Sequence, residues 1–327
     1  MSKVNRNDPK RSKASDARFT IFEFEREFPD DAVCMDYLVR LLYPFGITCP
    51  TCGKVTKHYR REKRTAYSCQ FCGHDEYPMK GTIFEGSATS LKLWFYAIHL
   101  MASTRCGISA KQLERELGVT YKTAWRMFNK IRSLIPQDGS GLFPIEKFDG
   151  IVEADEAYIG GRGQWRHNTK RIRKSGRPGR NDPYKTPVFG IAQRGQDGKH
   201  GKVMAKIVPV AGDSAILPHI RTKVLPSTAV YTDEFNAYNA LGQMGYRHSR
   251  VRHNQRVYVD GDVHVQTIEG FWSLVKRGIS GVYHGVSTKH LQSYLDEYVF
   301  RYNNRDATGR GMFDAFLFRV RKASPGA

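Results

Sequence analysis

The chain has 327 residues and a formal net charge of +20, from 52 Lys and Arg against 32 Asp and Glu. This length suggests two domains, or one large domain with small attachments, and the basic excess points to a nucleic acid or an anionic membrane surface. No run of 18 apolar residues exists, which excludes a membrane-spanning helix, and the polar first residues lack the apolar segment of a signal peptide, so we expect a cytoplasmic protein.

The N-terminal region is predicted to begin with a basic, disordered tail at residues 1–17. A helical segment follows at 18–44, where the spacing of apolar residues fits one or two short helices broken at Pro29.

Two closely spaced cysteine pairs predict a zinc ribbon over residues 45–80. Cys49-Pro-Thr-Cys52-Gly and Cys69-Gln-Phe-Cys72-Gly each place two thiolates on a tight turn that the following glycine permits. Two such turns brought together by a hairpin form a closed four-cysteine site for structural Zn²⁺. The basic residues between the pairs form a hairpin tip that either contacts phosphates or is simply solvated.

Residues 81–135 are predicted to be helical and to contain a helix-turn-helix. Ser109 and Thr120 can cap two helices, and Gly118 lies in the turn between them. The second helix would expose a face that suits the major groove of DNA. An ordinary helical hairpin with a solvated basic face is the alternative, and we favour DNA binding. The exposed positions are Tyr121, Lys122, Arg126, Asn129 and Lys130.

After a Gly- and Pro-rich linker at 136–147, residues 148–318 show strands followed by strands mixed with helices, which predicts an α/β layered domain. A densely basic insertion at 162–185 interrupts it, and residues 319–327 form a tail. Arg171, Arg173 and Lys174 of the insertion are candidates for contacts with DNA phosphates, although a solvated loop is equally compatible. The expected strands are 148–159, 188–193, 203–210 and 229–233, and the expected helices are 215–224, 236–244, 265–278 and 289–303.

Three acidic residues in this region suggest a site for divalent cations. Asp155 lies in an apolar strand, in which alternation puts Glu153 on its face and Glu156 on the other; Asp233 ends a second apolar strand. Glu269 lies on a late helix and shares a face with Gln266, Ser273 and Lys276. If the three carboxylates converge, they can hold a pair of Mg²⁺ or Mn²⁺ ions for phosphodiester chemistry, with Lys276 steadying a DNA phosphate.

The chain from about Phe19 to Arg319 resembles bacterial insertion-sequence transposases, because several sequence stretches match that family and occur in the same order. The group combines an N-terminal zinc ribbon with a DDE-type domain and is often called ISXO-like. The stretches are Cys49-Pro-Thr-Cys52-Gly, Gly107-Ile-Ser-Ala-Lys-Gln-Leu, Glu153-Ala-Asp155-Glu-Ala-Tyr-Ile-Gly-Gly161, Tyr231-Thr-Asp233-Glu, Thr267 to His284, Lys289-His-Leu and Phe300-Arg-Tyr-Asn-Asn-Arg305.

The resemblance implies an RNase H-like catalytic domain at 148–318 that cleaves and joins DNA strands without a covalent enzyme intermediate. Asp155 and Asp233 match the two aspartates of the family, Glu269 lies where the glutamate would, and Lys276 matches a lysine seven residues later. Related sequences often carry Asn in place of Gln266, so Gln266 competes with Glu269 as the third ligand, and we favour Glu269.

The expected partners are the terminal inverted repeats of the transposon and target DNA, bound by a homodimer or larger assembly associated with the bacterial nucleoid. Two other functions fit the same residues. The first is a catalytically inactive, sequence-specific DNA-binding protein, and the second is a metal-dependent RNase H-like nuclease that hydrolyses strands and never joins them.

Overall fold

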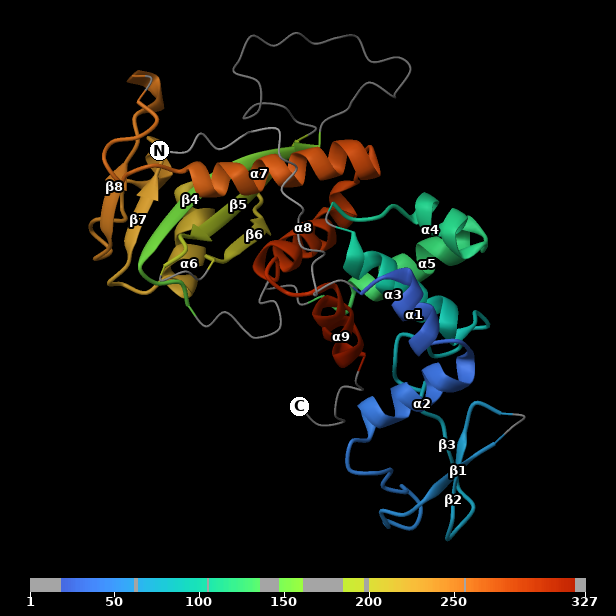
Figure 1. Ribbon diagram of the computed structural model, residues 1–327. Coiled ribbons are helices and arrows are strands. Elements are labelled where there is room, and N and C mark those ends of the chain that lie inside the picture. The colour runs from blue at the N-terminus through green and yellow to red at the C-terminus, as the bar shows by residue number, and fades with distance from the viewer. Residues whose placement is uncertain are drawn as a thin grey trace, which may run out of the picture. The chain divides into compact units, whose positions relative to one another are not determined.

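The computed structural model describes residues 19–61, 64–104, 106–135, 147–160, 185–196, 200–255 and 257–320 (Figure 1). The chain divides into two compact units, residues 1–103 with 306–327 and residues 104–305. Four predicted segments lie wholly or largely outside the described residues: the two tails, the linker and the basic insertion with Arg171, Arg173 and Lys174.

Over its described residues, the first unit contains four helices and a small antiparallel sheet of order β1-β2-β3. Thr20 and Asp30 cap the first two helices, and Pro29 lies between them, as the break in the sequence predicts. The elements of this unit are α1 Ile21–Glu27, α2 Asp31–Leu42, β1 His58–Arg60, β2 Tyr67–Cys69, β3 Asp75–Glu76, α3 Leu91–Ser103 and α9 Gly309–Arg319.

An aromatic core holds the helices of this unit together. Phe24, Phe28 and Phe95 are fully buried, and each ring lies within 6.2 Å of the Phe313 ring of α9, measured between centroids. Arg310, also on α9, pairs with Glu27 and Asp314. Because α9 completes this core, it belongs with the N-terminal helices and not with the 148–318 region to which the sequence pattern assigned it.

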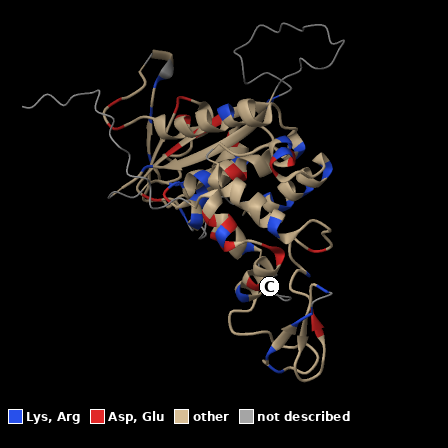
Figure 2. Ribbon diagram, turned by 45° about the vertical axis from the view of Figure 1, so that its right-hand side comes forward, with Lys and Arg blue, Asp and Glu red and all other residues tan. Residues whose placement is uncertain are grey.

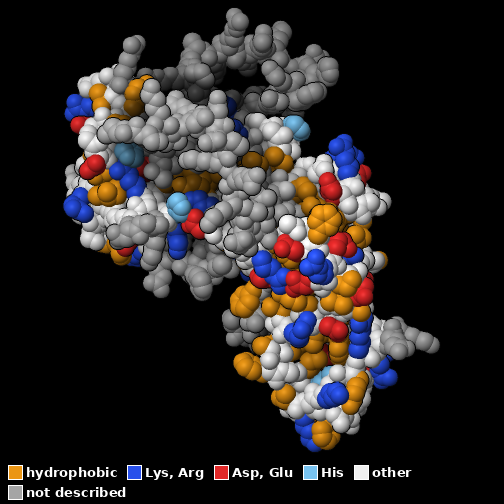
Figure 3. Space-filling view, in the orientation of Figure 1, with side chains coloured by type: hydrophobic (Ala, Val, Ile, Leu, Met, Phe, Trp, Pro, Cys, Tyr) orange, Lys and Arg blue, Asp and Glu red, His pale blue; other side chains and the backbone are white. Residues whose placement is uncertain are grey.

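The zinc ribbon is joined to α2 by side-chain hydrogen bonds. The Tyr67 hydroxyl donates to Asp36 at 2.6 Å, and the Tyr43 hydroxyl donates to Glu76 at 2.8 Å. Several hydrophobic side chains of the ribbon remain exposed (Figure 3). Phe71 among them is 64% exposed.

The second unit combines a helical pair with a five-stranded mixed sheet. The predicted 81–135 region is divided between the units, since α3 lies in the first and the helical pair α4–α5 in the second. The elements are α4 Ala110–Leu117, α5 Tyr121–Arg132, β4 Ile151–Gly160, β5 Lys185–Gln193, β6 Val203–Ile207, α6 Asp213–Lys223, β7 Ala229–Thr232, η2 Asn236–Tyr238, β8 Arg247–Arg250, η3 His253–Gln255, α7 Gln266–Gly278, η4 Ile279–Tyr283 and α8 Thr288–Asn303.

The sheet has the order β6-β5-β4-β7-β8. β4 pairs antiparallel with β5 and parallel with β7, and β7 pairs parallel with β8. One face packs on α6 and η2, and the other packs on α7 and α8, with acidic and basic residues interspersed along the helices (Figure 2). The layered α/β architecture that the sequence predicted is therefore present.

Two local predictions in this unit are wrong. Residues 236–244 form one short 3₁₀ helix followed by turns, because the chain closes back at Tyr246 before a longer helix can form. The strand β8 was missed, since Arg-His-Ser-Arg shows no apolar alternation and lies at the sheet edge. None of the described helices is both long and apolar enough to cross a membrane.

Candidate functional site

Asp155 and Asp233 lie side by side where the parallel pairing of β4 with β7 ends, Asp155 within β4 and Asp233 directly after β7. β4 and β7 pair in register up to Ala154 and Thr232, so the next residue of each strand is one of the aspartates. Asp155, Glu156 and Asp233 each offer one carboxylate oxygen, and these oxygens lie within 4.8 Å of one another. The structure thus brings together two of the three acidic residues that the sequence singled out, and adds a third that it did not.

Glu156 joins this cluster although it lies on the other face of β4. The alternation predicted for the strand holds, because Ala157 and Ile159 pack toward α7 and α8 while Val152 and Ala154 pack toward α6. β7 pairs with β4 only up to Ala154, so on that side of β4 no paired residue lies beside Asp155 and Glu156, and their carboxylates meet that of Asp233. Alternation alone gave no signal of this convergence.

Glu269 lies near the cluster without belonging to the group of three carboxylates. Its charge is close enough to raise the pKa of Asp155. Gln266 and Lys276 are exposed together with Glu269 and Ser273 along one side of α7, as predicted from helical spacing. The opposite side of α7 is buried, at Val265, Ile268, Trp272, Val275 and Ile279, and this also agrees with the prediction.

The helix that carries Glu269 is anchored to β4 by Glu153. This carboxylate is fully buried and accepts hydrogen bonds from the backbone N–H groups of Thr267 at 2.7 Å and Ile268 at 3.0 Å. It also pairs with Arg194 at 2.7 Å and lies 3.3 Å from His264 Nδ1. Glu153 therefore caps the N-terminus of α7 from the neighbouring strand and positions its exposed face.

A glycine on β5 lets α7 approach the sheet closely beside the cluster. Gly190 lies opposite Asp155 in the antiparallel register. A Cβ atom on Gly190 would lie 2.3 Å from Cζ2 of Trp272 on α7, so any larger residue would force the helix outward.

The carboxylates repel one another in the absence of a cation. Burial, followed by the charges of Glu156 and Asp233, raises the pKa of Asp155 to about 8. Burial and the same carboxylates also raise the pKa of the fully buried Tyr238. A crowded set of oxygen donors of this kind suits a hard divalent cation, which would relieve the repulsion, and the residues present therefore fit Mg²⁺ or Mn²⁺.

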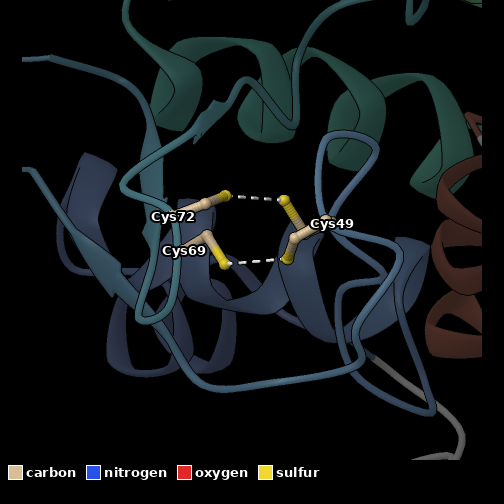
Figure 4. A group of neighbouring side chains, drawn as sticks. Cys49, Cys69 and Cys72 are labelled. Carbon is tan, nitrogen blue, oxygen red and sulfur yellow. Dashed lines mark hydrogen bonds between the residues drawn. The ribbon is translucent and has the colours of Figure 1, made fainter.

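The four cysteines of the ribbon form a second cluster, shown in Figure 4. Cys49 Sγ lies 3.4 Å from Cys72 Sγ, and Cys52 Sγ lies 3.8 Å from Cys69 Sγ. A tetrahedral zinc site with Zn–S bonds of about 2.3 Å separates its sulfur atoms by about 3.8 Å, so the cluster fits Zn²⁺. Gly53 and Gly73 adopt φ values of +67° and +71°, which confirms the turns that these glycines were predicted to permit.

Backbone amides favour the thiolate form at one side of this cluster. Burial opposes ionisation of Cys49, but hydrogen bonds from the amides of Cys52 and Thr51 lower the pKa of its thiol to about 7. This preorganises a ligand that must be deprotonated to bind zinc.

The helical pair α4–α5 has the caps that the sequence predicted. Ser109 accepts from the amide of Gln112, Thr120 accepts from the amide of Thr123, and Gly118 has a φ of +64°. Of the five predicted DNA contacts on α5, Tyr121, Lys122 and Arg126 are exposed, while Asn129 and Lys130 are half-buried.

Comparisons with known proteins match both units. Residues 147–303 match the profile of an ISXO2-like transposase domain, and residues 29–75 match that of a transposase zinc-ribbon domain. An uncharacterized protein in transposable element ISH50 of Halobacterium salinarum is 30% identical over 285 residues, which cover 84% of this chain and 92% of that protein.

Two further matches cover less of this chain. An uncharacterized transposase-like protein of Haemophilus influenzae is 32% identical over 105 residues, covering 32% of this chain and 84% of its own length. A crystal structure of a pre-cleavage Mos1 transpososome overlaps 66% of this chain and 75% of its own, with 11% identity and a TM-score of 0.24. That overlap is too loose for a comparison of sites.

Proposed function

Because the chain belongs to the insertion-sequence transposases that combine a zinc ribbon with an ISXO2-like transposase domain, we propose that it binds the terminal inverted repeats of its element and catalyses metal-dependent cleavage and joining of DNA strands. The observation that supports this most strongly is the meeting of Asp155 and Asp233 where the pairing of β4 with β7 ends.

In this proposal the second unit is an RNase H-like catalytic domain. Its five-stranded mixed sheet, with helices on both faces and acidic residues on two adjacent parallel-paired segments, supports the assignment. Asp155 and Asp233 hold divalent cations, and Glu269 completes the site from the exposed face of α7. Bound Mg²⁺ or Mn²⁺ would activate the attacking oxygen and stabilise the leaving oxygen in phosphodiester transfer.

Three other residues have distinct proposed roles. Glu156 is an additional candidate ligand, because its carboxylate lies in the same group as the aspartates. Gln266 lies one turn before Glu269 and is exposed, which suits a contact with DNA or an indirect contact with the ion. Lys276 extends the same exposed face and would pair with a phosphate.

DNA recognition is assigned to the helical pair and the zinc ribbon. Lys122 and Arg126 present an exposed basic face on α5, with Asn129 and Lys130 beside them, which suits the major groove. Arg171, Arg173 and Lys174 are proposed to contact DNA phosphates from the basic insertion. The family relationship further suggests that two or more subunits pair the two transposon ends, in the bacterial cytoplasm and at the nucleoid.

The test compares Asp155→Asn and Asp233→Asn with the unmodified protein on duplexes that contain the ends of its own element. Both variants are expected to bind the ends normally and to lose strand joining by at least about a thousandfold with Mg²⁺ or Mn²⁺, because the removed carboxylates bind the ions. Asp213→Asn, which changes an exposed acid on α6, is the matched control and should join normally.

Three results of this assay separate the candidate functions. Normal joining by either active-site variant would refute the proposed site. Cleavage without joining by the unmodified protein would identify a nuclease, and end binding without any cleavage would identify a DNA-binding protein that has lost catalysis.

A Glu269→Gln, Gln266→Ala and Glu156→Gln series then identifies the third ligand. The proposal expects Glu269→Gln to lose joining to the level of the aspartate variants, and the other two to retain part of it.

A further inference from the structure

A groove lies within the second unit between the helical pair α4–α5 and the segment formed by η4 and the start of α8. It has a volume of about 550 Å³, within the range of pockets that hold small ligands. Its lining includes Lys111, Arg115, Tyr121, Trp125, His284 and His290, and no Asp or Glu contributes to it. The groove is separate from the carboxylate cluster and the cysteine cluster.

Two aromatic rings line the groove and remain open to solvent. Trp125 is 43% exposed and Tyr121 is 50% exposed, although both belong to a helix whose other large apolar residues are buried. The Trp125 ring contacts His290 of α8 edge-on, with centroids 6.1 Å apart, so the indole is held in place while part of its surface stays accessible. An exposed aromatic surface that the fold holds in position is a typical stacking platform for a nucleobase.

The surrounding charges favour an anion. Arg115 is exposed in the last turn of α4, and Lys111 lies 5.8 Å from the centre of the Tyr121 ring while pairing with Glu114. The N-terminus of α8 has no acidic residue in its first turn, and the side chain of its N-cap Ser287 makes no capping hydrogen bond. The positive end of this 16-residue helix thus adds to the attraction for a phosphate group.

The groove is rigidly attached to the sheet domain by a buried ion-pair network. Arg132, at the end of α5, lies 3.0 Å from Glu297 of α8, and Arg301 pairs with the same carboxylate at 2.8 Å. The Arg132 guanidinium also lies 3.3 Å from the centre of the Tyr294 ring. Because these ion pairs join α5 to α8, they hold the α4–α5 wall of the groove at a fixed distance from the wall formed by η4 and the start of α8.

We propose that this groove binds an unpaired nucleotide of DNA, with its base stacked on Trp125 and its phosphate held by Arg115 and the N-terminus of α8. The proposal rests on the DNA-binding function proposed above and extends it. Lys122 and Arg126 project from α5 about 100° around the helix from Tyr121 and Trp125, so a strand leaving a duplex bound on that face would reach the groove. A duplex itself would not fill it, because paired bases have no free ring face to stack on the indole.

The experiment uses the full chain and measures fluorescence anisotropy with two probes at one fixed salt concentration. The probes are a labelled single strand of twelve thymidines and a labelled duplex that carries the element's end. Trp125→Ala is expected to weaken single-strand binding by about tenfold or more while duplex binding changes by less than about twofold. Trp125→Phe, which retains a stacking ring, should bind the single strand within about threefold of the unmodified protein.

Two further variants keep the proposal testable if Trp125→Ala fails to fold, as judged by circular dichroism. Arg115→Gln removes the phosphate contact without changing the aromatic wall, and should also weaken single-strand binding selectively. Phe318→Ala truncates a similarly exposed aromatic ring on α9, 52% exposed, and should leave single-strand binding unchanged.

The outcomes separate this proposal from the proposed function. Unchanged single-strand binding in a folded Trp125→Ala or Arg115→Gln variant overturns the groove assignment. If duplex binding is normal in that case, the proposed transposase function is not affected. Failure of the unmodified protein to bind either probe refutes DNA binding itself. Selective loss of single-strand binding in both variants supports the groove.

Discussion

The cysteine cluster and the carboxylate cluster are built in opposite ways. The four cysteines lie between residues 49 and 72 and are placed by two local turns with a glycine in each. The carboxylates come from Asp155, Glu156 and Asp233, and they meet only because β4 and β7 pair in a register that ends directly before both aspartates. One site is therefore a property of a short segment, and the other is a property of the folded sheet.

This contrast has an energetic counterpart. The ribbon that carries the cysteine cluster is short and lacks a large core of its own, so we expect its fold to depend on the metal. The carboxylate cluster lies in a sheet whose two faces are covered by buried hydrophobic residues, and the folded sheet imposes proximity on charges that repel. Removing the metal should therefore unfold the first region and leave the second intact.

Loss of zinc is expected to have the largest effect. Cys49→Ser should reduce bound zinc from one ion per chain to none, and the ribbon should unfold, because zinc contributes on the order of 10 kcal/mol in such modules. Metal analysis and limited proteolysis within residues 45–80 measure this. Cys106→Ser, at an exposed cysteine outside the cluster, should keep its zinc, and a protease-resistant ribbon in Cys49→Ser would contradict the claim.

Removing the charge of Glu153 should have the next largest effect. Glu153→Gln leaves Arg194 without its carboxylate and weakens the cap on α7, so the free energy of unfolding should fall by about 3 kcal/mol. Urea denaturation of the full chain measures the change. Glu156→Gln is the matched control in the same strand and should not show this loss; equal midpoints for Glu153→Gln and the unmodified protein would show that the anchor is unimportant.

Gly190→Ala tests how closely α7 must approach the sheet. The new methyl group would collide with Trp272, which should lower the free energy of unfolding by about 1–3 kcal/mol and reduce metal-dependent cleavage by displacing Glu269. Combining it with Trp272→Phe should recover part of both losses. Gly242→Ala, where a methyl group meets no neighbour within 4 Å, is the control. Full stability in Gly190→Ala would show that the helix can move freely.

The smallest effect is expected for the pH dependence of stability. In contrast to the variants above, the variant tested here should be more stable than the unmodified protein. Because the folded pKa of Asp155 is raised to about 8 from 3.8, its contribution to stability is greatest below pH 3.8 and is lost as the pH rises toward 8. Without added divalent cations, Asp155→Asn should therefore be more stable than the unmodified protein at pH 8. The difference in the free energy of unfolding should be only about 1–2 kcal/mol, because the carboxylate is half-buried, and the two stabilities should become equal near pH 4.

Thermal unfolding at several pH values measures this difference. Asp213→Asn, which lies outside the cluster, should show no such gain. Added Mg²⁺ should stabilise the unmodified protein and reduce the difference. A less stable Asp155→Asn at pH 8 would show that the cluster is not held under repulsion.

The amino-acid sequence alone determined the features that depend on neighbouring residues. The cysteine turns with Gly53 and Gly73, the caps at Ser109 and Thr120, and the exposed and buried sides of α7 all follow from spacing, because a turn or a helix places residues a few positions apart in a fixed geometry.

Only the tertiary structure decided the features that depend on distant residues. The inclusion of Glu156 in the acidic cluster, the anchoring of α7 by Glu153 and the membership of α9 in the first unit were not predictable. They arise from the register of β4 with β7, from the contact of β4 with α7, and from the packing of aromatic rings far apart in the chain. Such contacts depend on which surfaces meet in the fold, and no local pattern encodes that.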